Sequence, residues 1–228
     1  MKKDARSCFF FRFRLCYWAD LFYEKPLTRN GGPASEYYLA EPMYRVRPYP
    51  RSLETPVRKK ILKTVGEQYE KIFVNNDNTF NLSKVTDNIV ISRFRELSDY
   101  FNGNQVSSCG RTDSCKSILQ LRLRRLLSKY ENKKIILIAH SMGSVIAYDL
   151  LREYEDECRV HTFITLGSPL SHPVIRDSLQ RSTPGPLKTP LSITSAWYNF
   201  YDPMDMIVYD GTLSAYFQAN SSNIGVTD

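Results

Sequence analysis

The stretch that decides the fold is IILIAHSMGSVIAYDLL, residues 135–151. Its first five residues, 135–139, form an uninterrupted apolar run, which predicts a strand of a parallel sheet buried on both faces. Residues 144–154 predict a helix. The turn between them reads AHSMG over residues 139–143, the G-x-S-x-G pattern with alanine in the first small position. A buried strand, a sharp turn and a helix are the context that this motif requires.

The turn has small residues at both ends because a larger side chain there would collide with the neighbouring strand or helix. Ala139 and Gly143 occupy these positions. The turn exposes the hydroxyl of Ser141 at the carboxyl edge of the sheet, where it is a candidate nucleophile. The backbone amide of Met142, at the helix N-terminus, is a candidate donor to a developing oxyanion. The alternative is a structural turn that contains serine by chance, and the flanking strand and helix favour the functional interpretation.

Further elements alternate on both sides of this stretch. Strands are predicted over residues 160–166 and 195–200. A helix before the turn starts with Ser114 as N-cap and has leucines and isoleucines on one side: Ile118, Leu119, Leu123, Leu126 and Leu127. This alternation predicts an α/β fold with a parallel sheet covered by helices.

The N-terminal part is less regular. Residues 9–18 alternate aromatic and basic side chains, which predicts a strand, and the prolines and glycines of residues 28–56 predict a loop-rich excursion. A second amphipathic helix is predicted over residues 57–73, where the apolar positions are Ile61, Leu62, Val65, Tyr69, Ile72 and Phe73. A weaker helix is predicted over residues 86–101, followed by a polar turn over residues 102–113.

The chain resembles the α/β-hydrolase family, in particular its lipase-like and esterase-like members. The resemblance rests on the serine turn and on three other stretches: YWADL at 17–21, FITLGSP at 163–169 and WYNFYDPMD at 197–205. It implies a mostly parallel sheet flanked by helices, incomplete at both ends relative to the family. It also implies a single domain over residues 1–228, with residues 28–113 as an insertion or lid-like excursion.

In this fold the catalytic triad runs serine, acid, histidine along the chain. The resemblance implies Asp205 as the acid, with Asp202 as the alternative. The chain has three histidines, His140, His161 and His172, and none of them follows these aspartates. His140 is predicted to be structural, because neighbouring side chains on a strand point to opposite faces. His161 opens a strand and lies ~16 Å from the catalytic edge, so His172 alone is on the correct edge.

The resemblance implies a serine hydrolase of carboxylic esters that works through an acyl-enzyme on Ser141, without cofactor or metal. Its substrate would be a small-molecule or lipid ester. Because no histidine completes the triad, two hypotheses stay open. The chain is either a fragment of a longer hydrolase or a catalytically inactive binding protein with the α/β-hydrolase fold.

Composition and charge indicate which partners and which compartment to expect for the protein. The formal charge is +7, and residues 1–63 hold fourteen Lys and Arg against six Asp and Glu. A solvated basic surface explains this excess best; a membrane-surface contact stays open, and no nucleic-acid partner is expected because no such motif accompanies the charge. Five scattered cysteines indicate reduced thiols and hence a cytoplasmic protein. No stretch reaches the ~18–20 apolar residues of a membrane span.

Overall fold

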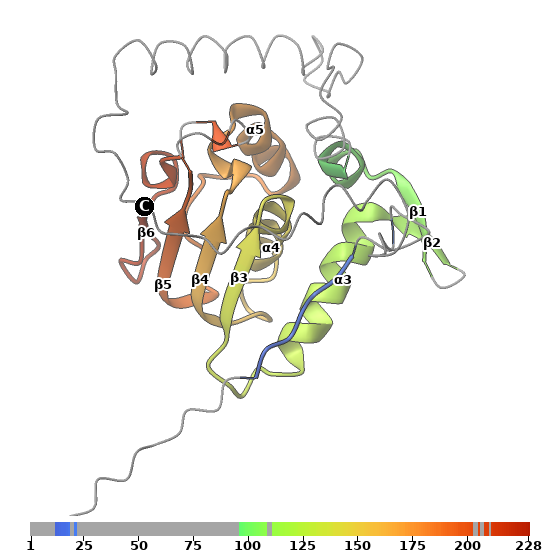
Figure 1. Ribbon diagram of the computed structural model, residues 1–228, viewed down its shortest axis with the longest axis horizontal. Coiled ribbons are helices and arrows are strands. Elements are labelled where there is room, and N and C mark those ends of the chain that lie inside the picture. Colours follow the sequence, from blue (N-terminus) through green and yellow to red (C-terminus); the bar gives the residue numbers. More distant parts are fainter. Residues whose placement is uncertain are drawn as a thin grey trace, which may run out of the picture.

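The computed structural model describes residues 12–18, 21, 96–108, 111–202, 205, 208–209 and 211–228. Its centre is a four-stranded sheet in the order β3-β4-β5-β6, in which every neighbouring pair is parallel (Figure 1). The strands are β3 (Ile136–His140), β4 (Val160–Leu166), β5 (Ile193–Phe200) and β6 (Val226–Thr227). The predicted α/β fold with a parallel sheet flanked by helices is therefore confirmed.

Two helices connect the strands. α4 (Met142–Glu153) joins β3 to β4, and α5 (Pro173–Ser182) joins β4 to β5 after the short 3-10 turn η3 (Pro169–Ser171). Since the strands follow one another in chain order and such crossovers are right-handed, both helices lie on the same face of the sheet. A hydrogen bond of 3.2 Å from the Arg152 guanidinium in α4 to the Leu179 carbonyl in α5 ties them together.

The core lies between this face of the sheet and the helices. Trp197 in β5 is fully buried, with ring centroids 5.3 Å from Phe163 in β4 and 5.5 Å from Tyr148 in α4. Phe217, after the 3-10 turn η5 (Leu213–Ala215), closes the same cluster at 5.3 Å from Trp197. Large aromatic rings thus anchor the strands to α4.

Helix α3 (Cys115–Ser128) packs against α4, and it begins as predicted. The Ser114 hydroxyl accepts a hydrogen bond from the Ser117 amide, which satisfies one free donor of the first turn. The leucines at 119, 123 and 127 are buried. Both the cap and the apolar side of this helix were readable in the sequence.

The polar turn predicted over residues 102–113 is wrong. β1 (Gln105–Ser108) and β2 (Arg111–Ser114) pair antiparallel as a hairpin, in register from Gln105 opposite Ser114 to Ser108 opposite Arg111. Backbone hydrogen bonds stabilise a hairpin whatever the polarity of its side chains, so a polar stretch did not exclude it. Of the helix predicted over residues 86–101, the described part, 96–101, is helical.

In its described part, residues 12–18, the segment predicted as a strand over residues 9–18 does not form a strand. This segment runs beside α3 instead (Figure 1), where the Arg122 side chain donates to the Tyr17 carbonyl at 3.2 Å and Arg14 to the Tyr130 hydroxyl at 2.8 Å. The Arg122 side chain of α3 thus occupies a backbone carbonyl that strand pairing could use. The excursion over residues 28–56 and the helix over residues 57–73 lie outside the described residues.

The prediction that β3 is buried on both faces is also wrong for the described structure. Ile136 and Ile138 are 50% and 54% exposed, while Ala139 is buried. The crossover helices α4 and α5 cover the other face, so neither of them covers this side of the strand. Among the described residues, no helix is long and apolar enough to cross a membrane.

Candidate active site

Ser141 lies in the turn between β3 and α4, and its backbone has a conformation that residues other than glycine rarely adopt. Its φ is 51° and its ψ −129°. Such a conformation costs on the order of 1–3 kcal/mol and persists only where the surroundings impose it. The Ser141 amide donates to the Leu166 carbonyl at the end of β4, 3.0 Å away, so sheet pairing continues into the turn. The sheet therefore helps to hold this residue in its strained geometry.

A chain of buried serines fixes the turn from the other side. The carbonyl of Ser141 accepts hydrogen bonds from the Ser144 amide at 2.9 Å and from the Ser144 hydroxyl at 2.6 Å. The same hydroxyl lies 2.7 Å from the hydroxyl of Ser168, which in turn accepts from the Leu170 amide at 3.3 Å. The turn is thereby tied to the loop that follows β4.

Sequence reasoning did not assign a role to Ser144 or Ser168. A usable pattern was present, because each serine directly follows a glycine at the carboxyl edge of the sheet, Gly143 and Gly167. What the sequence does not show is that the two hydroxyls meet, since that depends on the β3–β4 register.

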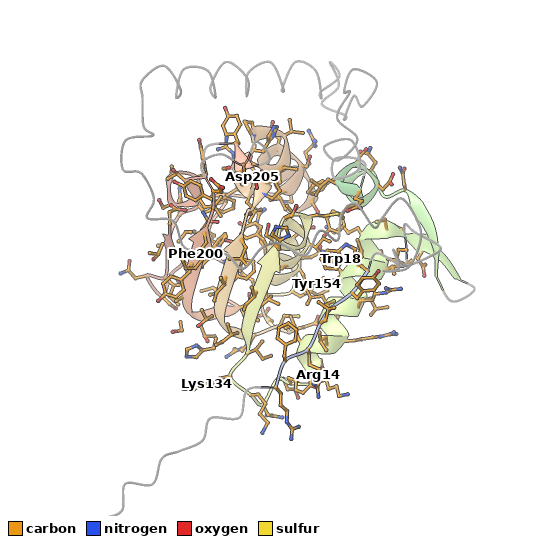
Figure 2. All side chains as sticks on the ribbon, in the orientation of Figure 1. Arg14, Trp18, Lys134, Tyr154, Phe200 and Asp205 are labelled. Carbon is orange, nitrogen blue, oxygen red and sulfur yellow. The ribbon has the colours of Figure 1, made fainter. Side chains whose placement is uncertain are left out.

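The glycine of the turn is required by a close neighbour. A Cβ on Gly143 would lie 2.7 Å from Cη2 of the Trp18 indole, well inside van der Waals contact. Figure 2 labels Trp18 beside the upper end of α3. Ala139, the small residue before the turn, is buried with 7% exposure. The expectation that both positions need small side chains thus has a physical reason at Gly143.

Met142 is the first residue of α4. An amide at this position has no carbonyl acceptor within its own helix and lies at the positive end of the helix dipole. The Met142 side chain is itself buried, with 1% exposure. The turn therefore presents a fixed backbone donor next to the serine.

Asp205 lies at the same edge of the sheet (Figure 2). Its Oδ2 atom is 3.4 Å from the position that a Cβ would take on Gly167, the residue directly after β4. Nε2 of His140, the last residue of β3, is 3.6 Å from the same point. Gly167 has a φ of 51° and no side chain, so the carboxylate and the imidazole both approach it. The structure brings Asp205 to the ends of β3 and β4.

The alternative acid, Asp202, is placed differently. It is an exposed residue, and its carbonyl accepts a hydrogen bond from the Asp205 amide at 2.9 Å. Asp202 thus shapes the loop in which Asp205 lies, and Asp205 is the partly buried carboxylate of the two.

His172 is built into the start of α5. It is 4% exposed, its Nδ1 accepts a hydrogen bond from the Val174 amide at 3.3 Å, and its ring contacts that of Tyr209. Burial, together with the nearby charge of Arg176, lowers the pKa of His172 to about 4. At neutral pH this imidazole is uncharged and serves as a helix cap.

The remaining histidine, His161, is the second residue of β4, at the end of the strand away from the turn, as predicted. Its Nδ1 lies 2.9 Å from the Thr162 hydroxyl. Over the described residues, no hydrogen bond joins the Ser141 hydroxyl to a histidine. The structure thus brings together Ser141, the Met142 amide and, at the same edge, Asp205, without a base on the serine.

A parallel sheet crossed by helices on one face, with a strained serine between its first described strand and the following helix, defines an α/β-hydrolase-type domain. The model of the PGAP1-like alpha/beta domain family matches residues 60–183, more than half of the chain. The chain belongs to this family, which is a member of the α/β-hydrolase superfamily. The match includes Ser141 and ends before β5 and Asp205. No curated protein and no solved structure matches the chain.

Proposed function

We propose that this domain is a serine hydrolase of carboxylic esters in which Ser141 is the nucleophile. The observation that supports it most directly is the backbone of Ser141, strained at φ 51° and held there by hydrogen bonds from both sides. Strain of this kind gathers at functional sites because it orients a reactive group. The family match supports a hydrolase-type scaffold around it.

The proposed reaction is acyl transfer through the serine. The Ser141 oxygen bonds to the ester carbonyl carbon, its proton passes to a general base, and the carbonyl electron pair moves onto the oxygen. The Met142 amide donates to that oxyanion. The carbon–oxygen bond to the alcohol then breaks, and the alcohol leaves with the proton. Water repeats the sequence on the acyl-serine and releases the carboxylic acid.

Asp205 is the proposed acid of the triad, in preference to Asp202, because its carboxylate lies beside Gly167 at the end of β4. Its role is to orient and stabilise an imidazolium on the base. No described histidine is hydrogen-bonded to Ser141, so no described residue supplies that base. General-base assistance is worth roughly 10²–10⁴ in rate. We therefore expect the 228 residues alone to react slowly.

The substrate is proposed to be a small-molecule or lipid ester, handled in the cytoplasm; in the lipid case the domain would work at a membrane surface.

A second candidate is a binding protein that keeps the scaffold and has no turnover. The placement of His172 favours it, because this histidine caps α5 and is buried away from solvent. Against it stands the strained conformation of Ser141, which a pure binding protein has no need to maintain.

The test is covalent labelling with a fluorophosphonate, with imidazole added to supply the missing base. The unaltered chain should be labelled at Ser141, faster with imidazole than without, and Ser141→Ala should lose the label. Ser128→Ala, at an exposed serine at the end of α3, is the matched control and should be labelled like the unaltered chain. A chain that is folded by circular dichroism yet unlabelled at any imidazole concentration would be the binding protein.

A further inference from the structure

Three large apolar side chains of the segment 12–18 point into solvent. Phe13 is 78% exposed, Leu15 71% and Tyr17 53%, and the first two are the most exposed large hydrophobic side chains among the described residues. Figure 1 shows the segment as an extended stretch beside α3, and neighbouring side chains of an extended chain point to opposite sides. Cys16 and Trp18 accordingly pack against the hydrophobic core. The outward side of the segment is therefore an apolar ridge.

Basic side chains surround this ridge. Arg122 of α3 donates to the Tyr17 carbonyl at 3.2 Å, and Arg14 donates at 2.8 Å to the hydroxyl of Tyr130, just after the helix. The segment thus runs antiparallel to α3, along the side of the helix that carries Arg122. The exposed basic residues of this side of the helix, of the segment and of the turn that follows the helix are Arg12, Arg14, Arg125, Lys129, Lys133 and Lys134.

The charge of this surface is almost entirely positive. Residues 12–18 contain no acid, and residues 121–135 contain one, Glu131. The ring centre of Tyr130 lies 5.9 Å from the guanidinium carbon of Arg14 and 6.0 Å from the ammonium of Lys129. The hydrogen bond from Arg14, together with these neighbouring charges, lowers the pKa of the Tyr130 hydroxyl, although desolvation by itself would raise it. Tyr130 therefore lies in a positive potential.

We call the ridge, the six exposed basic residues and Tyr130 together the basic-aromatic patch. It lies at one end of the domain, where Figure 2 labels Arg14 and Lys134, whereas Asp205 is labelled at the other end. Lys134 precedes β3, and Ser141 follows it. The patch is therefore separate from the candidate active site.

We propose that the basic-aromatic patch docks the domain on a bilayer that contains anionic phospholipids. Lys and Arg side chains near such a surface are attracted to its negative headgroups. Aromatic rings settle at the level of the headgroups, and apolar side chains enter the boundary with the acyl chains. Peripheral binding is stable where an apolar and an electrostatic contribution act together. The ridge supplies the first, and the cations beside it supply the second.

The apolar ridge favours a bilayer over a nucleic acid. Both partners are polyanions, and both accept aromatic rings beside cationic side chains. Leu15, however, lies in the middle of the ridge and has no π face on which a base could stack. A bilayer accepts all three side chains of the ridge. The proposal extends the lipid case of the proposed function, but it depends on the patch and not on Ser141.

Co-sedimentation of the full 228-residue chain with lipid vesicles tests it. Vesicles of phosphatidylserine mixed with phosphatidylcholine should bind the chain about tenfold or more tightly than vesicles of phosphatidylcholine alone. Lys133→Gln combined with Lys134→Gln should weaken binding roughly 25-fold, at about fivefold for each cation. Phe13→Ser combined with Leu15→Ser should weaken it about tenfold or more, because the ridge no longer enters the bilayer.

Two matched variants control for charge and for apolar surface. Arg181→Gln with Lys188→Gln removes the same charge from α5 and from the segment before β5, outside the patch. Phe200→Ser removes an exposed ring at the carboxyl end of β5. Both should bind the vesicles like the unaltered chain, and circular dichroism checks that every variant is folded. Ser141→Ala should also bind like the unaltered chain, so that failure of docking and failure of labelling are separate results.

Four outcomes would overturn the proposal. The first is a folded chain that does not bind the mixed vesicles, and the second is an equal loss of binding in the patch variants and their controls. The third is binding that depends on Lys133 and Lys134 but not on Phe13 and Leu15, which would be adsorption by charge alone. The fourth is tighter binding to a single-stranded oligonucleotide that the same patch variants abolish, which would identify a nucleic-acid surface.

Discussion

Ser141 shows how a single residue can depend on its neighbours for an unfavourable geometry. Its carbonyl receives both the amide and the hydroxyl of Ser144, and that hydroxyl is itself held by Ser168. The strain therefore persists because several hydrogen bonds oppose its release. Removing one of them should affect the serine before it affects the rest of the fold.

We therefore expect Ser144→Ala to destabilise the fold by about 1–2 kcal/mol and to slow fluorophosphonate labelling of Ser141. Ser178→Ala is the matched control, because Ser178 is also buried but lies in α5. Urea unfolding gives the stability, and mass spectrometry gives the labelling rate of the folded fraction. If both variants label Ser141 at the same rate, Ser144 does not position it.

The close approach of Trp18 gives a second prediction. Gly143→Ala should destabilise the domain by about 1–3 kcal/mol, because the added methyl meets the indole at 2.7 Å. In the double variant with Trp18→Phe, the smaller ring leaves room and part of the loss should be recovered. Thermal unfolding of the four chains of this cycle measures the coupling, and additive losses would show that the two residues are not in contact.

His172 gives a prediction on pH. Its pKa is about 4 in the folded protein, where burial and then Arg176 lower it, against an ordinary value of 6.5. As the pH falls from 6.5 to 4 the unfolded chain takes up a proton that the folded chain does not. Stability should therefore be full above pH 6.5 and decline by up to about 3 kcal/mol toward pH 4.

His172→Asn should flatten this decline, because asparagine can still cap the first turn of α5 but does not titrate. Urea unfolding at pH 4, 5, 6 and 7 compares the two chains. Identical slopes would mean that another group is responsible for the pH dependence.

At the scale of elements, a buried polar cluster joins α3 to α4. Lys116 in α3 lies 2.9 Å from carboxylate oxygens of both Asp149 and Glu153 in α4, and the Tyr100 hydroxyl donates to Asp149 at 2.7 Å. Asp149 is fully buried. Burial alone would raise the pKa of Glu153, but hydrogen bonds from Lys116 and Gln120 outweigh it and lower that pKa. One ammonium group of α3 thus pairs with two carboxylates of α4.

Lys116→Met should destabilise the domain by about 3 kcal/mol or more, because it leaves the Asp149 carboxylate buried without its cation. Adding Asp149→Asn should restore much of the loss. Glu157→Gln, which removes an ion pair with Arg124 on the exposed side of α3, should cost below about 1 kcal/mol. Urea unfolding of all four chains tests this, and equal losses for the Lys116 and Glu157 variants would contradict it.

Which elements were predictable follows from how local their causes are. Ser114 and the spacing of the leucines predicted α3, and the apolar run with the serine pattern predicted β3 and α4. These signals could be read because each of them depends on residues only a few positions apart. The hairpin of β1 and β2 and the bare side of Ile136 and Ile138 depend on pairing and on distant segments. The same holds for the site: Ser141 was readable, while its link to Ser168 and the approach of Asp205 to Gly167 required the β3–β4 register.

At the scale of the whole molecule, α4 and α5 cover one face of the sheet, and Ser141 lies where β3 passes into α4. Among the described residues, no hydrogen bond joins the Ser141 hydroxyl to a histidine. A base supplied in solution should therefore help, and imidazole should accelerate fluorophosphonate labelling of the folded chain. An unchanged labelling rate would mean that the missing base does not limit the reaction of Ser141.

The strand order has a consequence for synthesis. Each strand from β4 to β6 pairs with the strand that precedes it in the chain, so the loops to be closed between partners are short. A ribosome delivers the chain in this same order. Each strand therefore leaves the exit tunnel when its template is already present, and the sheet can grow at one edge while translation continues.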